Sequence, residues 1–312
     1  MVERVQPADR QHSESWQPRL VALDIDGTLL KWVEGEGQTY EQISPAVYDA
    51  VHAAVDAGAH VVLASGRSPH GMDKIADLLD LPRDGADRLW VVASNGAVIF
   101  RYPPLEVVHE ETFDAREAVR QVLEQHPEAL VAVEERGVGY RVNRPFPRGE
   151  LSGEMIETEL DEIVGGPVSR VIIRDPTASA DDFVTMAAKL GLHGTDYVVG
   201  WTAWLDLAPV GVSKASGLDR VARELGVGRE DTLAIGDGRN DVEMLQWAGR
   251  GVAMGQAVQE VLDAADVTTD TVYEDGAAVE LRRWFRDGPG GPSSTQGFRD
   301  GPGGTPQPNG FP

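Results

Sequence analysis

The chain has 312 residues, 41% of them hydrophobic, which allows two domains with a substantial buried core and excludes a disordered chain. With 28 basic against 51 acidic residues, the formal net charge of −23 argues against nucleic acid or an anionic membrane as the main partner. The absence of cysteine excludes disulfides, thiolate metal sites and a cysteine nucleophile.

The two ends of the chain are predicted to be disordered. Residues 1–18 are rich in Gln, Arg, Glu and Pro and lack the apolar segment of a secretory signal. Residues 287–312 are rich in Gly, Pro and Ser, and the sequence Phe-Arg-Asp-Gly-Pro-Gly-Gly at 285–291 recurs at 298–304. No apolar run is long enough to span a bilayer, so we expect a cytoplasmic protein.

Between these ends, strand-like and helix-like segments alternate, as a doubly wound parallel sheet requires. The strand predicted at 20–24 leads to a helix that Ser44 caps, that Pro45 begins and that Gly58 follows. Further strands are predicted at 60–64, 89–93, 232–235 and 251–254, and further helices begin near 69, 213, 240 and 256. The pattern predicts an α/β, Rossmann-like core.

The alternation is lost over about 100–200, which indicates an insertion. This stretch contains strand-like runs at 129–133, 170–173 and 197–207 and a helix-like run at 180–190. We expect a small α+β cap over residues 99–204, laid on a core made of residues 19–98 and 205–286. Within this predicted cap, Glu134 and Glu135 are interpreted as a solvated edge.

Polar residues cluster where the predicted core strands end. In a parallel sheet these ends face one crevice, so residues far apart in sequence converge there. The four groups are Asp24 to Thr28 after the first strand, Ser65-Gly66-Arg67 after the second, Lys214 at a helix start, and Gly236 to Asp241 after the strand at 232.

Carboxylates packed together cannot all stay ionised without a cation. Oxygen ligands without His or Cys favour Mg²⁺, which prefers a few carboxylates, waters and a substrate phosphate. Lys214 is interpreted as holding phosphate and neutralising charge in the transition state. Taken alone, each group has a plainer interpretation: a turn, a helix cap or a surface lysine. Their joint arrangement predicts a phosphoryl-transfer site.

These motifs resemble those of the haloacid dehalogenase superfamily, in particular its Cof-like phosphatases with a type IIB cap. The first motif stands at Asp24 to Thr28, the second at Ser65, the third at Lys214 and the fourth at Gly236 to Asp241. Four motifs in order are a specific signal, whereas one alone is not. The segments Ser94 to Ala97 and Glu274 to Ala277 also match the subfamily. Gln256 departs from it, because many members have Asn there.

The resemblance implies a role for each matched residue. Asp24 would be the nucleophile, and Asp26 would be the general acid and base. Mg²⁺ would be held by Asp24, the backbone carbonyl of Asp26 and Asp237, with Asp241 in support. The groups that would bind phosphate are Thr28, Ser65, Gly66, Lys214 and Asn240. Arg67 would contact substrate or pair with a structural carboxylate.

The sequence therefore predicts a Mg²⁺-dependent phosphatase that hydrolyses a small phosphorylated metabolite, such as a sugar phosphate, through an aspartyl phosphate. A phosphotransferase of the phosphomannomutase kind and a non-catalytic binding protein on the same fold are the alternatives. We expect a monomer. The sequence does not specify the substrate, because the residues that select it lie in the predicted cap, where no motif is recognisable.

Overall fold

In the computed structural model, the described residues are 16–32, 39–82, 88–135, 138–147, 150–151, 153–175, 195–199 and 204–285. The predicted helix at 180–190, residues 1–15 of the predicted lead and the predicted tail lie outside them. No helix within these ranges combines the length and the apolar character needed to cross a membrane.

The larger of the two main sheets has eight strands, in the order β16-β15-β14-β1-β4-β5-β6-β7. The first six strands in this order run parallel to one another. The last two, β6 and β7, are each antiparallel to the strand before them. Along the chain the strands are β1 (Leu20–Leu23), β4 (His60–Ala64), β5 (Leu89–Ala93), β6 (Val98–Tyr102), β7 (Glu106–Glu110), β14 (Thr232–Gly236), β15 (Arg250–Ala253) and β16 (Val267–Thr268). The apolar run at 20–23 forms the central strand β1. All four of its residues are buried, because helices cover both faces of the sheet at this position.

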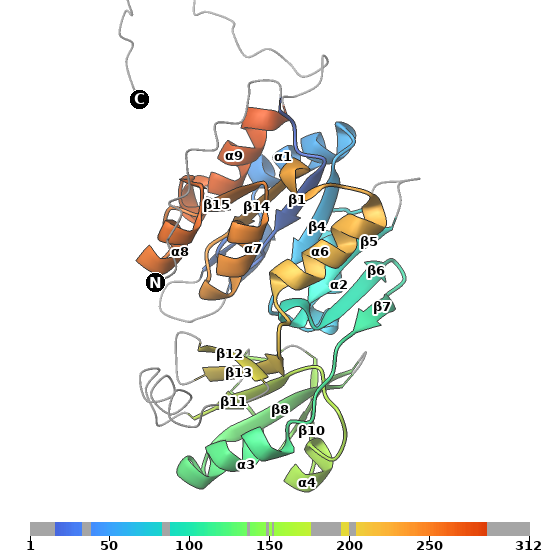
Figure 1. Ribbon diagram of the computed structural model, residues 1–312, viewed down its shortest axis with the longest axis vertical. Coiled ribbons are helices and arrows are strands. Elements are labelled where there is room, and N and C mark those ends of the chain that lie inside the picture. Colours follow the sequence, from blue (N-terminus) through green and yellow to red (C-terminus); the bar gives the residue numbers. More distant parts are fainter. Residues whose placement is uncertain are drawn as a thin grey trace, which may run out of the picture.

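Helices cover both faces of this sheet (Figure 1). One face packs on α1 (Pro45–Asp56), α2 (Pro69–Leu78) and α9 (Gly276–Trp284). The other packs on α6 (Lys214–Leu225), α7 (Val242–Trp247) and α8 (Gln259–Ala264). As predicted, Ser44 caps α1, its Oγ accepting the N–H of Val47 at 3.2 Å. The predicted fold class, a doubly wound sheet with an inserted cap, is confirmed.

The second sheet has six strands, in the order β10-β9-β8-β11-β13-β12. Its strands are β8 (Leu130–Glu135), β9 (Gly139–Val142), β10 (Glu154–Glu157), β11 (Val171–Arg174), β12 (Thr195–Val199) and β13 (Trp204–Pro209). Helices α3 (Arg116–Gln125) and α4 (Leu160–Ile163) pack on one face. Figure 1 shows this sheet at the end of the molecule where β1 and β4 finish. We call this part, from Glu111 to Pro209, the cap.

The domain boundaries expected from the sequence stay predictions, and the strand pairing differs from them in two places. The strands β6 and β7 pair with the larger sheet, although most of both falls in the predicted cap range. The strand β13 pairs within the cap sheet, although the core was expected to resume at 205. Trp16, in the predicted disordered lead, packs edge-on against Trp284 with ring centroids 4.7 Å apart.

Short elements join the longer strands and helices. A two-stranded ribbon, β2 (Leu30–Trp32) and β3 (Thr39–Ile43), follows β1. The 3-10 turns within the described ranges are η1 (Ser94–Gly96), η2 (Arg229–Asp231), η3 (Arg239–Asp241) and η4 (Val272–Glu274). The turn η1 directly follows β5, and η3 begins three residues after the last residue of β14, so both bring polar residues to the edge of the sheet where the site lies.

Candidate active site

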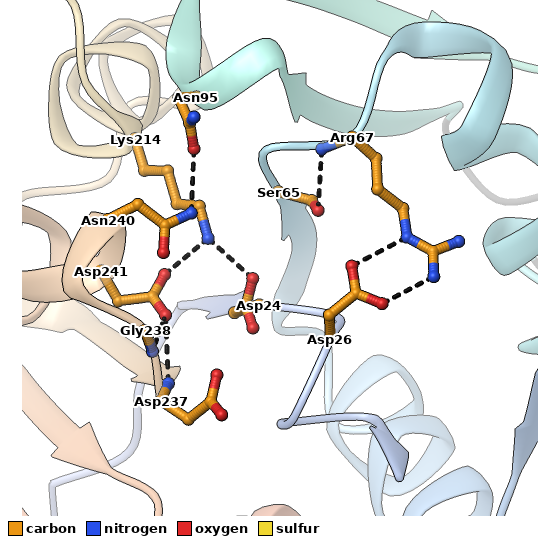
Figure 2. A network of polar contacts seen from close by, with 10 residues as sticks. All are labelled: Asp24, Asp26, Ser65, Arg67, Asn95, Lys214, Asp237, Gly238, Asn240 and Asp241. Carbon is orange, nitrogen blue, oxygen red and sulfur yellow. Dashed lines mark hydrogen bonds and ion pairs between the residues drawn. The ribbon is translucent and has the colours of Figure 1, made fainter. Parts of the chain in front are cut away.

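The ends of β1, β4 and β14 bring the sequence-predicted groups together at one edge of the larger sheet (Figure 2). Asp24 follows β1, Ser65 follows β4 and Asp237 follows β14, and all three are buried. Parallel neighbours end at the same edge, so the register alone places these side chains close to one another.

The turn after β1 carries Asp24 into the site and then folds back. The Asp24 N–H donates to Ile235 O on β14 at 3.0 Å, which extends the pairing by one residue. The N–H groups of Thr28, Leu29 and Leu30 all converge on Ile25 O. Gly27, at φ +84°, adopts the left-handed conformation that this tight return requires.

Lys214 lies fully buried between two carboxylates. Its Nζ donates to Asp24 Oδ1 at 2.7 Å and to Asp241 Oδ1 at 2.6 Å. Burial by itself would lower the pKa of Lys214, but the charges of Asp24 and Asp241 outweigh it and raise that pKa, so the ammonium is retained. Ser213 fixes the start of α6 through a capping box with Ser216, which holds Lys214 at the first helical position.

Asp241 organises the loop that carries Asp237. Its Oδ2 accepts the N–H groups of Asp237 at 3.0 Å and Gly238 at 2.9 Å, while its Oδ1 binds Lys214. Gly236 is required here because a Cβ at this position would lie 2.5 Å from Asp241 Cγ. Both oxygens of Asp241 are therefore already engaged by protein donors, which favours support of the loop over direct metal coordination.

Asp24 and Asp237, with Asp241 close by, fit a divalent cation. Ligand oxygens of Asp24, Asp237 and Asp241 all lie within 4.8 Å of one another. Burial, followed by the charge of Asp241, raises the pKa of Asp24 well above its ordinary value despite the opposing Lys214. A cation would reverse this effect and keep Asp24 ionised, and an oxygen-only donor set suits Mg²⁺.

Gln256 supports this cluster in a way that sequence analysis missed. Its Nε2 donates to Gly27 O at 2.6 Å and to Asp237 Oδ2 at 3.2 Å, and its Oε1 accepts the N–H of Val272 at 2.9 Å. The amide thus ties the turn after β1 to Asp237. The signal was present as a departure from the family pattern, but nothing in the sequence indicated these partners.

Of the phosphate-binding residues predicted from the sequence, Ser65 lies on one side of Asp24, and Lys214 and Asn240 lie on the other (Figure 2). Ser65 Oγ accepts the Arg67 N–H at 3.2 Å, which leaves its own proton available to another acceptor. Asn240 Nδ2 donates to Asn95 Oδ1 at 2.9 Å, so η3 and η1 hold each other. Thr28 Oγ1 is buried and has no hydrogen-bond partner among the described residues.

Asp26 points away from Asp24 and toward Arg67 (Figure 2). The guanidinium binds the carboxylate through two hydrogen bonds, Nε to Oδ2 at 2.8 Å and a terminal nitrogen to Oδ1 at 2.6 Å. Of the two roles left open for Arg67, the structure shows the ion pair, and its partner is the predicted acid–base residue. Such a two-point contact fixes the orientation of the carboxylate.

A cavity of about 340 Å³ lies beside Lys214, between the core and the cap. The core contributes Lys214, Asn95 and Asn240, and the cap contributes Arg170 and Asp206. Sequence analysis identified neither cap residue, because no motif marks them. The interpretation of Glu134 as a solvated edge is wrong, since its side chain is only 7% exposed and contacts Ser94 and Arg170.

Together, a doubly wound sheet, an inserted cap and an Asp–Lys–Asp cluster at the strand ends define a class of phosphoryl-transfer hydrolases. A family profile described as haloacid dehalogenase-like hydrolase matches residues 21–281, so the chain belongs to that family. The resemblance to Cof-like members and the predicted enzyme class, a phosphatase of this family, are confirmed.

Phosphoglycolate phosphatase of Natronomonas pharaonis is 32% identical over 263 residues, which cover 84% of this chain and 96% of that protein. The 5-amino-6-(5-phospho-D-ribitylamino)uracil phosphatase YitU of Bacillus subtilis is 27% identical over 292 residues, covering 86% and 98%.

Among solved structures, the phosphatase BT1666 of Bacteroides thetaiotaomicron matches with a TM-score of 0.68 at 26% identity, covering 91% of this chain and 98% of that one. The subclass IIB sugar phosphatase BT4131 shares the fold, with a TM-score of 0.71 at 23% identity over 85% of this chain and 98% of that one.

Proposed function

We propose that this protein is a Mg²⁺-dependent phosphatase that hydrolyses a small phosphorylated metabolite through an aspartyl-phosphate intermediate. The observation that carries the proposal is the buried Lys214, bonded to Asp24 and Asp241 beside an interdomain cavity. Burying an ammonium and two carboxylates carries a desolvation cost that well-packed apolar residues would avoid, which supports a functional role for the charge. A phosphate group placed next to Asp24 would use it.

The proposed chemistry begins when an Asp24 carboxylate oxygen attacks phosphorus and the bond to the leaving oxygen breaks. Asp26 gives that oxygen a proton, so the product alcohol leaves neutral. A water molecule then attacks phosphorus in the aspartyl phosphate, and Asp26 takes a proton from that water. The bond between phosphorus and the Asp24 oxygen breaks, which releases inorganic phosphate and regenerates the Asp24 carboxylate. In the structure Asp26 is held by Arg67, so it must turn toward the substrate for both proton transfers.

The phosphate oxygens would be bound by Ser65, Lys214 and Asn240, with Thr28 and the Gly66 backbone close by. The buried, unpartnered Thr28 hydroxyl supports a ligand on this side. Asp24, the Asp26 carbonyl and Asp237 would hold Mg²⁺, with Asp241 and Gln256 fixing Asp237. When bound, Mg²⁺ neutralises charge on these carboxylates and on the phosphate.

The substrate is proposed only as a class, a phosphomonoester of a small polar molecule. The relatives named above act on different compounds by their names, which fits a shared site with a variable cap. The cavity supports a small leaving group, since it adjoins Lys214 and is lined in part by the cap residues Arg170 and Asp206. The monomeric state and the cytoplasmic location stay predictions of the sequence.

The test is phosphate release from an aryl phosphate and a panel of sugar phosphates, with Mg²⁺ or with chelator. We expect metal-dependent release that Asp24→Asn abolishes, because an amide cannot act as the nucleophile. Asp49→Asn is the matched control, since Asp49 is an exposed carboxylate on α1. Transfer of phosphate to a second sugar without release would indicate the mutase alternative, and no turnover of any compound would indicate a binding protein.

A further inference from the structure

The cap contains a buried ion cluster on three neighbouring strands. Glu134 lies on β8, Arg170 directly precedes β11 and Asp206 lies on β13. A terminal nitrogen of Arg170 binds Asp206 Oδ2 at 2.8 Å, and the other lies 3.4 Å from Glu134 Oε1. The Arg170 side chain is 7% exposed. Two carboxylates thus share one guanidinium, and the three side chains together carry a formal net charge of −1.

This cluster also contacts the core. The terminal nitrogen of Arg170 nearest Glu134 donates to the backbone carbonyl of Gly66, in the turn after β4. Glu134 accepts the Ser94 hydroxyl through both carboxylate oxygens, at 2.7 and 2.8 Å. The cap pair Arg170 and Glu134 is therefore hydrogen-bonded to the two core turns that contain Ser65 and Asn95.

The bond to Gly66 bears on Ser65 through a single peptide unit. In a trans peptide the carbonyl and the following N–H point in opposite directions. The Gly66 carbonyl faces Arg170, and the Arg67 N–H of the same unit donates to Ser65 Oγ at 3.2 Å. Holding the carbonyl thus fixes the donor that orients the Ser65 hydroxyl.

The same turn is held from its other side by η1. The Ser94 N–H donates to Arg67 O at 2.8 Å, and the Asn95 N–H donates to Ser65 O at 3.1 Å. With these two bonds in place, the Gly66–Arg67 peptide is the part of the turn whose orientation depends on the cap. The guanidinium fork suits this task because it reaches three acceptors at fixed angles, which an ammonium cannot do.

We propose that Arg170 is a positioning residue for the reaction: through the Gly66 carbonyl it sets the orientation of the Ser65 hydroxyl toward phosphate, so that docking of the cap completes the phosphate site. This inference rests on the proposed function. It gives the cap a part in binding phosphate itself, in addition to its contact with the leaving group.

The test is a double-mutant cycle in kcat/KM with Arg170→Lys and Ser65→Ala. Arg170→Lys keeps the positive charge between Glu134 and Asp206 but loses the fork. We expect each single variant to lower kcat/KM about tenfold or more, and the double variant to be no more than about threefold below Ser65→Ala. The inhibition constant of inorganic phosphate with Mg²⁺ should rise in parallel, which lost stability alone would not cause.

Two controls separate this route from general loosening of the cap. Arg174→Lys alters the last residue of β11, an arginine that pairs with Glu150 inside the cap, and it should leave both measurements unchanged. Ser94→Ala removes the contact between Glu134 and the core, and its effect should add to that of Ser65→Ala. If Arg170→Lys does not fold, Glu134→Gln with Arg170→Gln, which keeps the net charge of the cluster, takes its place.

Additive effects of Arg170→Lys and Ser65→Ala would overturn the inference while leaving the phosphatase intact. Equal coupling of Ser94→Ala to Ser65→Ala would also overturn it, because any cap contact would then serve. If the wild type releases no phosphate from any compound, the proposed function fails, and the inference fails with it. The wild-type assay thus distinguishes the two failures.

Discussion

At the scale of single residues, Lys214 has the most unusual environment. It is a fully buried ammonium whose described partners are two carboxylates that also fit a metal site. Its removal leaves Asp24 and Asp241 buried without their counter-charge, a change that typically costs about 3–5 kcal/mol in other proteins. The same two carboxylates should then depend on a divalent cation for their neutralisation.

We therefore expect Lys214→Gln to lower phosphate release at least about 100-fold and to unfold at a lower temperature in chelator. Mg²⁺ should restore more of the melting temperature in this variant than it adds to the wild type. Thermal unfolding with and without Mg²⁺ measures this. Lys31→Gln, at a partly exposed pair with Asp275, should cost at most about 1 kcal/mol. Equal Mg²⁺ shifts in the wild type and Lys214→Gln would contradict the account.

At the scale of elements, the site depends on how closely η1 approaches the start of α6. Gly96 has φ +103°, and a Cβ there would lie 2.1 Å from Ser213 O. Because Ser213 caps α6, any displacement at this contact moves Lys214 as well. The short turn after β5 thereby sets the position of a side chain that is more than a hundred residues away in the sequence.

Gly96→Ala is expected to destabilise the protein by several kcal/mol and to reduce phosphate release. Gly226→Ala is the matched comparison: Gly226 also has a positive φ, +64°, but a Cβ there meets nothing within 4 Å. Gly226→Ala should lower the free energy of unfolding only by the cost of placing a Cβ on a left-handed backbone, about 1–2 kcal/mol. Chemical denaturation of both variants gives the two free energies of unfolding, and equal values would rule out the steric explanation.

At the scale of the whole molecule, the cap and the core meet through polar groups. Besides the contacts of Arg170 and Glu134, the buried Tyr140 hydroxyl on β9 is hydrogen-bonded to Ser68 of the core. Burial, followed by the charge of Glu134, raises the pKa of Tyr140 to about 12. An interface with so many desolvated polar groups tolerates charge changes poorly.

The raised pKa of Tyr140 gives a prediction for alkaline pH. A phenol whose pKa is higher in the folded state contributes its full share of stability below the ordinary pKa near 10, and this share is lost as pH rises toward about 12. Tyr140→Phe should therefore show a smaller fall in the free energy of unfolding over that interval. Denaturation at several pH values measures it, and an equal fall in both proteins would count against a buried, neutral phenol.

Much of the site was predictable because the motif residues follow buried strands. The apolar run at 20–23 indicates β1, and parallel strands end at one edge, so Asp24, Ser65 and Asp237 had to meet. Lys214 was recognisable by its place at the start of a predicted helix and by the family motif. The orientation of Asp26 toward Arg67 was left as one of two possibilities, because an ion pair between residues 41 positions apart has no local signature.

The sequence by itself determined the doubly wound core, the presence of an insertion and the residues at the strand ends, because periodicity, caps and glycines act over a few neighbouring residues. Only the tertiary structure decided that β6 and β7 extend the larger sheet, that Gln256 braces Asp237, and that Glu134, Arg170 and Asp206 form a buried cluster against Gly66 and Ser94. The contacts of Gln256 and of this cluster join residues between 16 and 229 positions apart. Their energies depend on burial and mutual geometry, and neither is encoded in any short stretch of sequence.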